Sequence, residues 1–199
     1  MKNTLAYLTE LLRRRNEQPD EAPRIDLELN KTFYAQRAIY VSDMSGFSRI
    51  VKTHGIIHFL AMIQQMRDLS IPAIEQNHGA IVKTEADNVF AVFECVEDAV
   101  RTSQQVLSAC GRVNAGLPPD RQTHLSIGIG WGKILLIDYH DMYGDEMNLA
   151  SKLGEDVAER DEVLLTDAAH GALAQGYVRS EQRALDISGV ALRYWAISR

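Results

Sequence analysis

Asp43 and Asp87 are the two residues of this 199-residue sequence whose surroundings most clearly indicate chemistry. Asp43 follows the apolar run Ala38–Ser42, which has the composition of a buried strand. Asp87 lies in the turn between the runs 80–85 and 88–94, which together are typical of a hairpin. If the first strand lies beside that hairpin, the two carboxylates converge, and Mg²⁺ prefers such oxygen ligands. The pair is therefore a candidate metal site, although helix capping or turn formation accounts for either aspartate alone.

The residues after Asp43 form a short turn that leads into a predicted helix. Backbone amides in such a turn, together with the positive end of the helix, favour a phosphate group. The candidate phosphate-binding residues are Met44, Ser45, Gly46, Phe47 and Ser48.

Asn148 and Lys152 form the third group of candidates. They stand four residues apart in a stretch with helical spacing, so both side chains lie on one face of that helix. An amide and a cation that point the same way suit a ribose and a phosphate. The same spacing is equally typical of a solvated helix face, so both interpretations remain open.

The elements that must position these residues follow the order β-α-β-β-α-β, with additional elements at the end. Apolar periodicity predicts strands over 38–42, 80–85, 88–94, 124–131, 133–137, 162–165 and 191–197, and helices over 56–76, 99–110, 144–153 and 166–173. Pro72 is expected to end or kink the first long helix. The order indicates the α+β class, with a ferredoxin-like split βαβ core, a mostly antiparallel sheet and helices on one face.

An N-terminal appendage over 1–36 precedes the main domain, which we place at 37–199. The first fifteen residues predict an amphipathic helix capped by Asn3, with a stripe of Leu5, Leu8, Leu11 and Leu12. Residues 17–30 contain two prolines and many charges, which is typical of a linker. The helix is expected to pack on its own domain or on a second copy, with a loose membrane contact as the minor alternative. It is too short and too charged for a transmembrane segment or a secretion signal.

The composition excludes several other classes of protein. Hydrophobic residues make up 46% and charged residues 24%, which is typical of a soluble globular domain. The formal net charge of −6 argues against a large basic surface, so no nucleic acid is expected as a partner. The two cysteines, Cys95 and Cys110, lack the spacing of metal ligands and are expected to be reduced thiols of a cytoplasmic protein.

Three segments, in order and in register, resemble the signature of class III adenylate and guanylate cyclases. Val41–Ser48 is similar to the family's F-x-D-x-x-G-F-T/S turn, apart from its first residue, and Lys83–Asp87 is similar to its K-x-x-G-D motif. Asp141–Lys152 is similar to D-x-x-G-x-x-x-N-x-A-S-R. The resemblance extends over 37–197 and implies that the main domain is a nucleotidyl cyclase catalytic domain.

The chain departs from the family pattern at three places. Ala86 replaces a glycine, which is tolerated if its φ is negative. Lys152 replaces an arginine, which keeps the charge but loses the planar, bidentate fork. The family's further lysine near the last strand, which grips the triphosphate, has no counterpart here, and Arg183 and Arg193 are the candidates to replace it.

The resemblance implies a role for each candidate residue. Asp43 and Asp87 would bind two Mg²⁺ or Mn²⁺ ions, Asn148 would orient the ribose, and Lys152 would neutralise charge on the α-phosphate. Family sites form between two domains, one supplying the metal ligands and the other the remaining groups. A chain with both sets would therefore act as a two-fold homodimer, inactive as a monomer and held in part by Leu5–Leu12.

The base is expected to be adenine, so the product would be 3′,5′-cyclic AMP, with pyrophosphate released from ATP. Adenine presents an acceptor at N1 and a donor at its 6-amino group, and guanine reverses both. Lys83 and Asp141 occupy the positions at which ATP-specific members of the family carry a Lys donor and an Asp acceptor. Two alternatives remain open: a cyclase for guanylate or a pyrimidine nucleotide, and a catalytically degenerate module that binds nucleotide or a partner without turnover.

Overall fold

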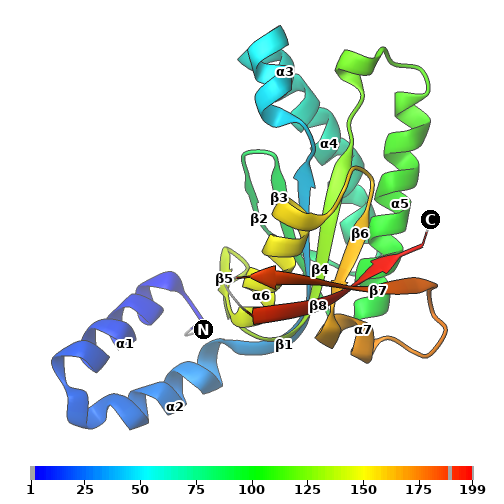
Figure 1. The fold of residues 1–199 in the computed structure, drawn as a ribbon. Coiled ribbons are helices and arrows are strands. Elements are labelled where there is room, and N and C mark those ends of the chain that lie inside the picture. Colours follow the sequence, from blue (N-terminus) through cyan, green and yellow to red (C-terminus); the bar gives the residue numbers. More distant parts are fainter. Residues whose placement is uncertain (1–2, 188–189, 199) are drawn as a thin grey trace.

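The computed structural model describes residues 3–187 and 190–198, with all side chains among them except those of 47–50, 187, 190 and 191. Its centre is an eight-stranded sheet in the order β2-β3-β1-β4-β6-β8-β7, with β5 paired to β4 (Figure 1). The strands are β1 Tyr34–Met44, β2 Ala80–Glu85, β3 Asn88–Phe93, β4 Leu125–Ile137, β5 Asp141–Tyr143, β6 Val163–Thr166, β7 Ser180–Ile187 and β8 Val190–Ile197. The helices are α1 Leu5–Glu17, α2 Ala22–Phe33, α3 Phe47–His54, α4 Ile56–Gln76, α5 Val96–Asn114, α6 Asp145–Ser151 and α7 Asp167–Ala172, with 3₁₀ turns at Pro19–Glu21 and Pro119–Arg121 and a π-helix at Lys152–Val157.

The mostly antiparallel α+β sheet confirms the predicted fold class. β1 pairs antiparallel with β3 on one side and with β4 on the other, so it lies in the middle of the sheet. Among the described strand pairs, only β4 with β6 is parallel. The predicted hairpin of β2 and β3 is also present, next to β1.

Helices lie on both faces of this sheet, which corrects the prediction of helices on one face. Tyr40 and Phe93 belong to the core beneath α4 and α5, and their rings lie 6.3 Å apart between centroids. Ile39 and Val41 belong to a second core on the opposite face, together with Ala150 of α6. Successive residues of β1 therefore enter two separate cores, as the two-residue period of a strand requires.

One prediction about strands of the main domain was wrong, and one strand was missed. The strands predicted over 124–131 and 133–137 are a single strand, β4, which pairs with β1 from Leu125 to Leu135. Of the two effects expected of Pro72, it does not end α4, which continues to Gln76; the proline occupies an exposed position within the helix. β7 was not predicted, since its sequence is mostly charged or polar and it forms the exposed edge of the sheet beside β8.

The predicted linker over 17–30 is also wrong, because most of it forms α2. Pro23 stands in the first turn of that helix, where a missing N–H is tolerated. Ile25, Leu29 and Phe33 recur every four residues and are buried together with Leu8 and Leu11 of α1. The two helices therefore form a hairpin that projects beside the N-terminal end of β1 (Figure 1).

The start of α1 differs in detail from the prediction. Thr4, rather than Asn3, is the N-cap, and its hydroxyl accepts a hydrogen bond from the amide of Tyr7 at 3.2 Å. Asn3 instead binds the end of β4: its amide donates to Leu136 O at 3.1 Å, and its carbonyl accepts from Asp138 N at 3.0 Å. Asn3 thereby ties the start of the first helix to the main domain of the same chain, and contact with a second copy stays a prediction.

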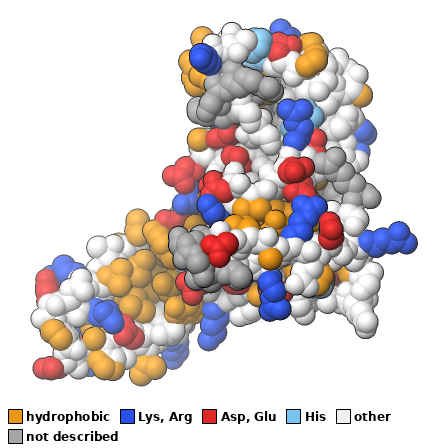
Figure 2. All heavy atoms as spheres, viewed as in Figure 1, with side chains coloured by type: hydrophobic (Ala, Val, Ile, Leu, Met, Phe, Trp, Pro, Cys, Tyr) orange, Lys and Arg blue, Asp and Glu red, His pale blue; other side chains and the backbone are white. Residues whose placement is uncertain are grey.

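The helical hairpin keeps apolar side chains at its surface (Figure 2). Leu5 is 62% exposed, Leu12 43% and Leu27 72%. An apolar side chain is also exposed at the start of α4. Ile57 is 81% exposed, although it belongs to the apolar positions that predicted this helix. Among the residues that the structure describes, no helix combines the length and the hydrophobicity needed to cross a membrane.

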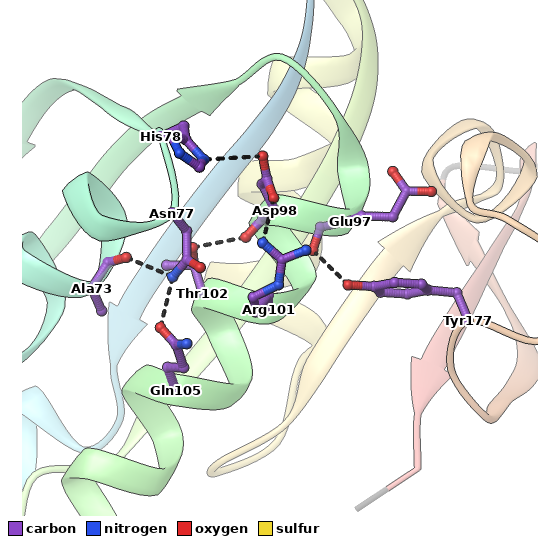
Figure 3. Close-up of polar contacts among 9 residues, drawn as sticks. All are labelled: Ala73, Asn77, His78, Glu97, Asp98, Arg101, Thr102, Gln105 and Tyr177. Atoms are coloured by element: carbon purple, nitrogen blue, oxygen red, sulfur yellow. Dashed lines mark hydrogen bonds and ion pairs between the residues drawn. The ribbon is translucent and has the colours of Figure 1, made fainter.

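Polar contacts fasten the layer of α4 and α5 to the loop before β7 (Figure 3). The side-chain amide of Asn77, at the end of α4, donates to Gln105 Oε1 at 2.6 Å. The hydroxyl of Tyr177 donates to the carbonyl of Glu97 in the first turn of α5 at 3.3 Å. The first contact joins α4 to α5, and the second joins α5 to the loop before β7, so segments that are distant in the sequence are connected.

Candidate active site

Asp43 and Asp87 lie close together at one end of the sheet. The ladder pairs Ser42 with Val89, so the end of β1 runs beside the start of β3 and the turn that carries Asp87. Partial burial, and then the negative charges of Asp87 and Glu155, raise the pKa of Asp43 to about 7. The structure thus brings together the two carboxylates that the sequence nominated as metal ligands.

The chemistry of this pair fits a divalent cation. Burial also raises the pKa of Asp87, and among the described side chains neither aspartate forms an ion pair. Converging carboxylates without a compensating cation are costly, and bound Mg²⁺ or Mn²⁺ would supply the opposite charge. Asp43 and Asp87 are therefore suited to hold such an ion.

The turn before Asp87 adopts an unfavourable backbone conformation. Ala86 has a φ of +48°, in the left-handed region, so the condition of a negative φ, under which alanine would be tolerated there, is not met. Arg67 of α4 donates a hydrogen bond to the carbonyl of Ala86 at 3.0 Å, which helps to hold the turn. The position suits the glycine of the related motif better than the alanine present here.

The turn after Asp43 is only partly available for phosphate. Gly46 has a φ of +96° and leads directly into α3. The amide of Ser45 donates to the carbonyl of His124 at 3.0 Å, and the amide of Met44 acts on the carboxylate of Asp43. These two amides already donate to acceptors within the chain. The amides at the start of α3 are therefore the ones that could bind a phosphate ligand. The side chains of Phe47 and Ser48 lie outside the described part of the structure.

Glycines of β4 allow α6 and the π-helix to lie directly on the sheet. A Cβ at Gly128 would stand 2.0 Å from the carbonyl oxygen of Ala150. Conversely, a Cβ at Gly154 would stand 2.9 Å from the carbonyl oxygen of Val41, two residues before Asp43. No side chain fits between these backbones, so the segment that carries Asn148 and Lys152 has a fixed position over β1 and β4.

Glu146 fastens the same segment through its side chain. Its Oε2 accepts hydrogen bonds from the amide of Trp131 on β4 at 3.1 Å and from the hydroxyl of Thr166 on β6 at 2.7 Å. The pairing of β4 with β6 ends at Ile129 and Leu165. The carboxylate of Glu146 therefore bridges the two strands just beyond their last backbone pair. Sequence reasoning missed this residue, because an acidic side chain in the first turn of a helix is also typical of a solvated position.

Asn148 and Lys152 lie at the surface of the α6 segment. Asn148 is exposed, and its backbone amide continues the helix by donating to Gly144 O at 3.0 Å. The ammonium of Lys152 forms an ion pair with Asp156 at 2.6 Å, and its side chain is 41% exposed. Both side chains are thus at least partly accessible to solvent, and the ammonium of Lys152 is held by a carboxylate of its own helical segment.

Lys83 and Asp141 form an ion pair, with Nζ 3.1 Å from Oδ1. They come from β2 and β5, which are not neighbours in the sheet. β5 and the C-terminal end of β4 pack on one face of the hairpin formed by β2 and β3. There Leu136 and Met142 share a core with Val82. That packing brings together the two residues proposed for base recognition.

Arg183 and Arg193, the candidates to replace the missing lysine, both have carboxylate partners. Arg183 binds Glu162 at 2.8 Å, and Arg193 binds Asp167 at 2.8 Å. Each guanidinium would have to leave its carboxylate in order to grip a triphosphate.

A model of the adenylate and guanylate cyclase catalytic domain matches residues 29–198. The chain belongs to this family. The cyclase domain is 26% identical over 133 residues to "Putative adenylate cyclase 3" of Rhizobium meliloti (strain 1021). The aligned residues cover 67% of this chain but only 22% of that protein. The aligned part thus spans less than a quarter of that relative.

Solved structures of cyclases share the fold of the cyclase domain. The adenylate/guanylate cyclase/hydrolase of Silicibacter pomeroyi superposes with a TM-score of 0.71 at 27% identity, over 83% of this chain and 98% of that one. The guanylate cyclase domain from Catenaria anguillulae, solved in complex with GTP, superposes with a TM-score of 0.69 over 82% and 96% of the two chains. At 13% identity, this second likeness shows a common fold alone. Residues 29–198 thus form a catalytic domain of the adenylate and guanylate cyclase family, which includes proteins named for either base.

Proposed function

We propose that this cyclase domain converts ATP to 3′,5′-cyclic AMP and pyrophosphate at sites shared by two copies of the chain. The convergence of Asp43 and Asp87 carries the proposal, because two half-buried carboxylates without a cation match the requirements of a metal-dependent phosphoryl site. In the reaction, the ribose 3′-oxygen forms a bond to the α-phosphorus while the bond to the bridging oxygen breaks. Pyrophosphate leaves, and the proton of the 3′-hydroxyl passes to solvent.

The metal-binding and positioning residues would divide this work. Mg²⁺ or Mn²⁺ held by Asp43 and Asp87 would lower the pKa of the 3′-hydroxyl and offset charge on the triphosphate. Asn148 would hold the ribose so that its 3′-oxygen faces the phosphorus. Lys152 would leave Asp156 and neutralise the charge that grows on the α-phosphate.

The preference for ATP is supported by the pair of Lys83 and Asp141. Lys83 would donate to N1 of adenine, and Asp141 would accept from the 6-amino group. Guanine presents a donor at N1 and an acceptor at O6. The donor Lys83 would then face a donor, and the acceptor Asp141 would face an acceptor. Selectivity for adenine follows from the order of donor and acceptor.

Two copies are proposed because, among the described side chains, the charged groups that act on the metal ligand Asp43 are all carboxylates. The charges that act on Asp43 within its own chain are those of Asp87, Glu155 and Asp156. The positive group that stabilises the α-phosphate would come from Lys152 of a second copy, and two-fold symmetry would give two equivalent sites. A cytoplasmic location remains part of this proposal.

The decisive experiment is incubation of the purified protein with each of the four nucleoside triphosphates and Mn²⁺ or Mg²⁺. Cyclic AMP is the expected main product, and Asp43→Ala should lower the rate by at least about 10²-fold, since the variant loses a metal ligand. A cyclic product of another base would replace the proposed substrate. A well-folded dimer that forms no cyclic product from any of them would contradict catalysis and favour the degenerate module, for which the paired Lys152 is the supporting observation.

A further inference from the structure

Tyr143 contacts the carboxylate of Asp141 directly. The two residues stand on the same side of β5, since they are two positions apart in a strand. The hydroxyl of Tyr143 donates to Oδ2 of Asp141 at 2.7 Å. The other oxygen, Oδ1, accepts from the amide of Met142 at 2.9 Å and lies 3.1 Å from Nζ of Lys83.

These contacts determine how Asp141 is oriented. An ionised carboxylate offers about four acceptor positions. Three donors on two different oxygens prevent rotation of the group and leave about one position for a ligand. The only proton of the Tyr143 hydroxyl points at Asp141, so it is not available to the acceptor at O6 of a guanine.

We propose that Tyr143 is a positioning residue for base selection, acting through Asp141 to favour adenine over guanine. The inference rests on the proposed function and extends it beyond the pair of Lys83 and Asp141. Tyr143 would hold the carboxylate with one oxygen facing the 6-amino group, and Lys83 would be held next to it for N1.

The charge state of Asp141 supports the same conclusion. Burial acts to raise its pKa, but hydrogen bonds from Tyr143, from the amide of Met142 and from Lys83 lower it below the ordinary value. Asp141 is therefore ionised at neutral pH and can only accept hydrogen bonds. An acceptor suits the amino group of adenine and opposes the carbonyl of guanine, whereas a protonated carboxyl would tolerate both.

The surroundings of Tyr143 indicate that its hydroxyl is not needed for folding. Its side chain is 50% exposed and lies outside the buried clusters of the described chain. The buried residue of this strand is Met142. Loss of the hydroxyl should therefore leave the fold and the thermal stability unchanged.

Tyr143→Phe tests the inference, with Tyr139→Phe as the matched control. Tyr139 lies in the turn between β4 and β5 and is 45% exposed. We expect Tyr143→Phe to lower the ratio of kcat/KM for ATP to kcat/KM for GTP about three- to tenfold, the effect of one ordinary hydrogen bond, because Tyr143 acts on the base only through Asp141. The control should leave the ratio unchanged. An unchanged ratio in Tyr143→Phe, or a wild-type protein that prefers GTP, would overturn the inference.

A second variant shows whether Tyr143 acts through Asp141. Asp141→Asn should lower the ratio by itself, and adding Tyr143→Phe to it should change the ratio no further. Additive effects would contradict action through Asp141. If the wild-type protein forms no cyclic product, the proposed function fails, and calorimetric binding of the α,β-methylene analogues of ATP and GTP still measures the ratio. In that case an unchanged binding ratio in Tyr143→Phe overturns the inference separately.

Discussion

Ala86, next to the candidate metal ligand Asp87, occupies a backbone conformation that disfavours every side chain with a Cβ. Its φ of +48° costs an L-residue about 1–2 kcal/mol relative to glycine. Residues in such conformations are found at functional sites, where the surrounding structure holds them. The hydrogen bond from Arg67 and the pairing of β2 with β3 are the contacts that hold this one.

Ala86→Gly is therefore expected to stabilise the protein. Glycine relieves the strain but adds freedom to the unfolded chain, so the net gain in the free energy of unfolding should be roughly 0.5 kcal/mol. Urea denaturation measures it. Ala61→Gly, at an exposed position inside α4, is the control and should destabilise by about 1 kcal/mol. Equal losses in both variants would show that Ala86 is not strained.

At the scale of elements, α6 depends on Glu146 for its attachment to the sheet. The carboxylate joins β4 and β6 at the point where their pairing stops, and the hydroxyl of Thr166 also caps α7 by accepting from the amide of Ala169 at 3.1 Å. Asn148 and Lys152 lie two and six residues after Glu146 in the sequence. Their positions therefore rest on a contact between three elements.

Glu146→Ala should lower both stability and turnover. The amide of Trp131 and the hydroxyl of Thr166 lose their acceptor, which costs about 1–3 kcal/mol in the free energy of unfolding. Movement of Asn148 should lower kcat more than it changes KM, because orientation of the ribose matters most in the transition state. Calorimetry and steady-state rates measure the two effects.

Asp145→Ala is the matched control, because Asp145 is an exposed acid in the same helical turn. It should change stability by no more than about 0.5 kcal/mol. If both variants lose stability and turnover to the same extent, the loss results from the missing negative charge at the helix start and not from the missing contacts of Glu146 with Trp131 and Thr166. Glu146→Gln, which keeps an acceptor, should recover part of the lost turnover.

The order of elements was largely readable from the sequence, and the exceptions have physical causes. The long helix α4 and the hairpin of β2 and β3 were predicted within about a residue, since each has a clear apolar period and a turn between Ala80 and Phe93. α2 was missed because its one proline, the proline just before it and its charges outweighed an apolar stripe of only three residues. β7 was missed because an exposed edge strand needs no apolar alternation.

At the scale of the whole molecule, the proposed site requires two chains. One chain would supply Asp43 and Asp87, and its partner would supply Asn148 and Lys152. Apolar side chains remain exposed on the N-terminal hairpin and at the start of α4, where a second copy would cover them (Figure 2).

Mixing two inactive variants tests this arrangement. Asp43→Ala and Asn148→Ala should each be nearly inactive, yet a mixture should regain activity, because one site of each heterodimer is intact. Random exchange makes half the dimers mixed, so the mixture should reach about a quarter of wild-type activity. The measurement is cyclic nucleotide formation after co-refolding. A mixture as inactive as its components, although mixed dimers form, would place all four groups in one chain.

The sequence by itself determined the family, the strand that carries Asp43 near its end and the hairpin with Asp87 in its turn, because these depend on short motifs and on local periodicity. Only the tertiary structure decided the positive φ of Ala86, the attachment of Glu146 to two strands, and the contact of Lys83 with Asp141 and Tyr143. Each of these depends on contacts between segments that are distant in the sequence: α4 with the turn of the hairpin, α6 with β4 and β6, and β5 with β2. Local patterns indicate which residues are buried, but the partner that each one meets is set by long-range packing.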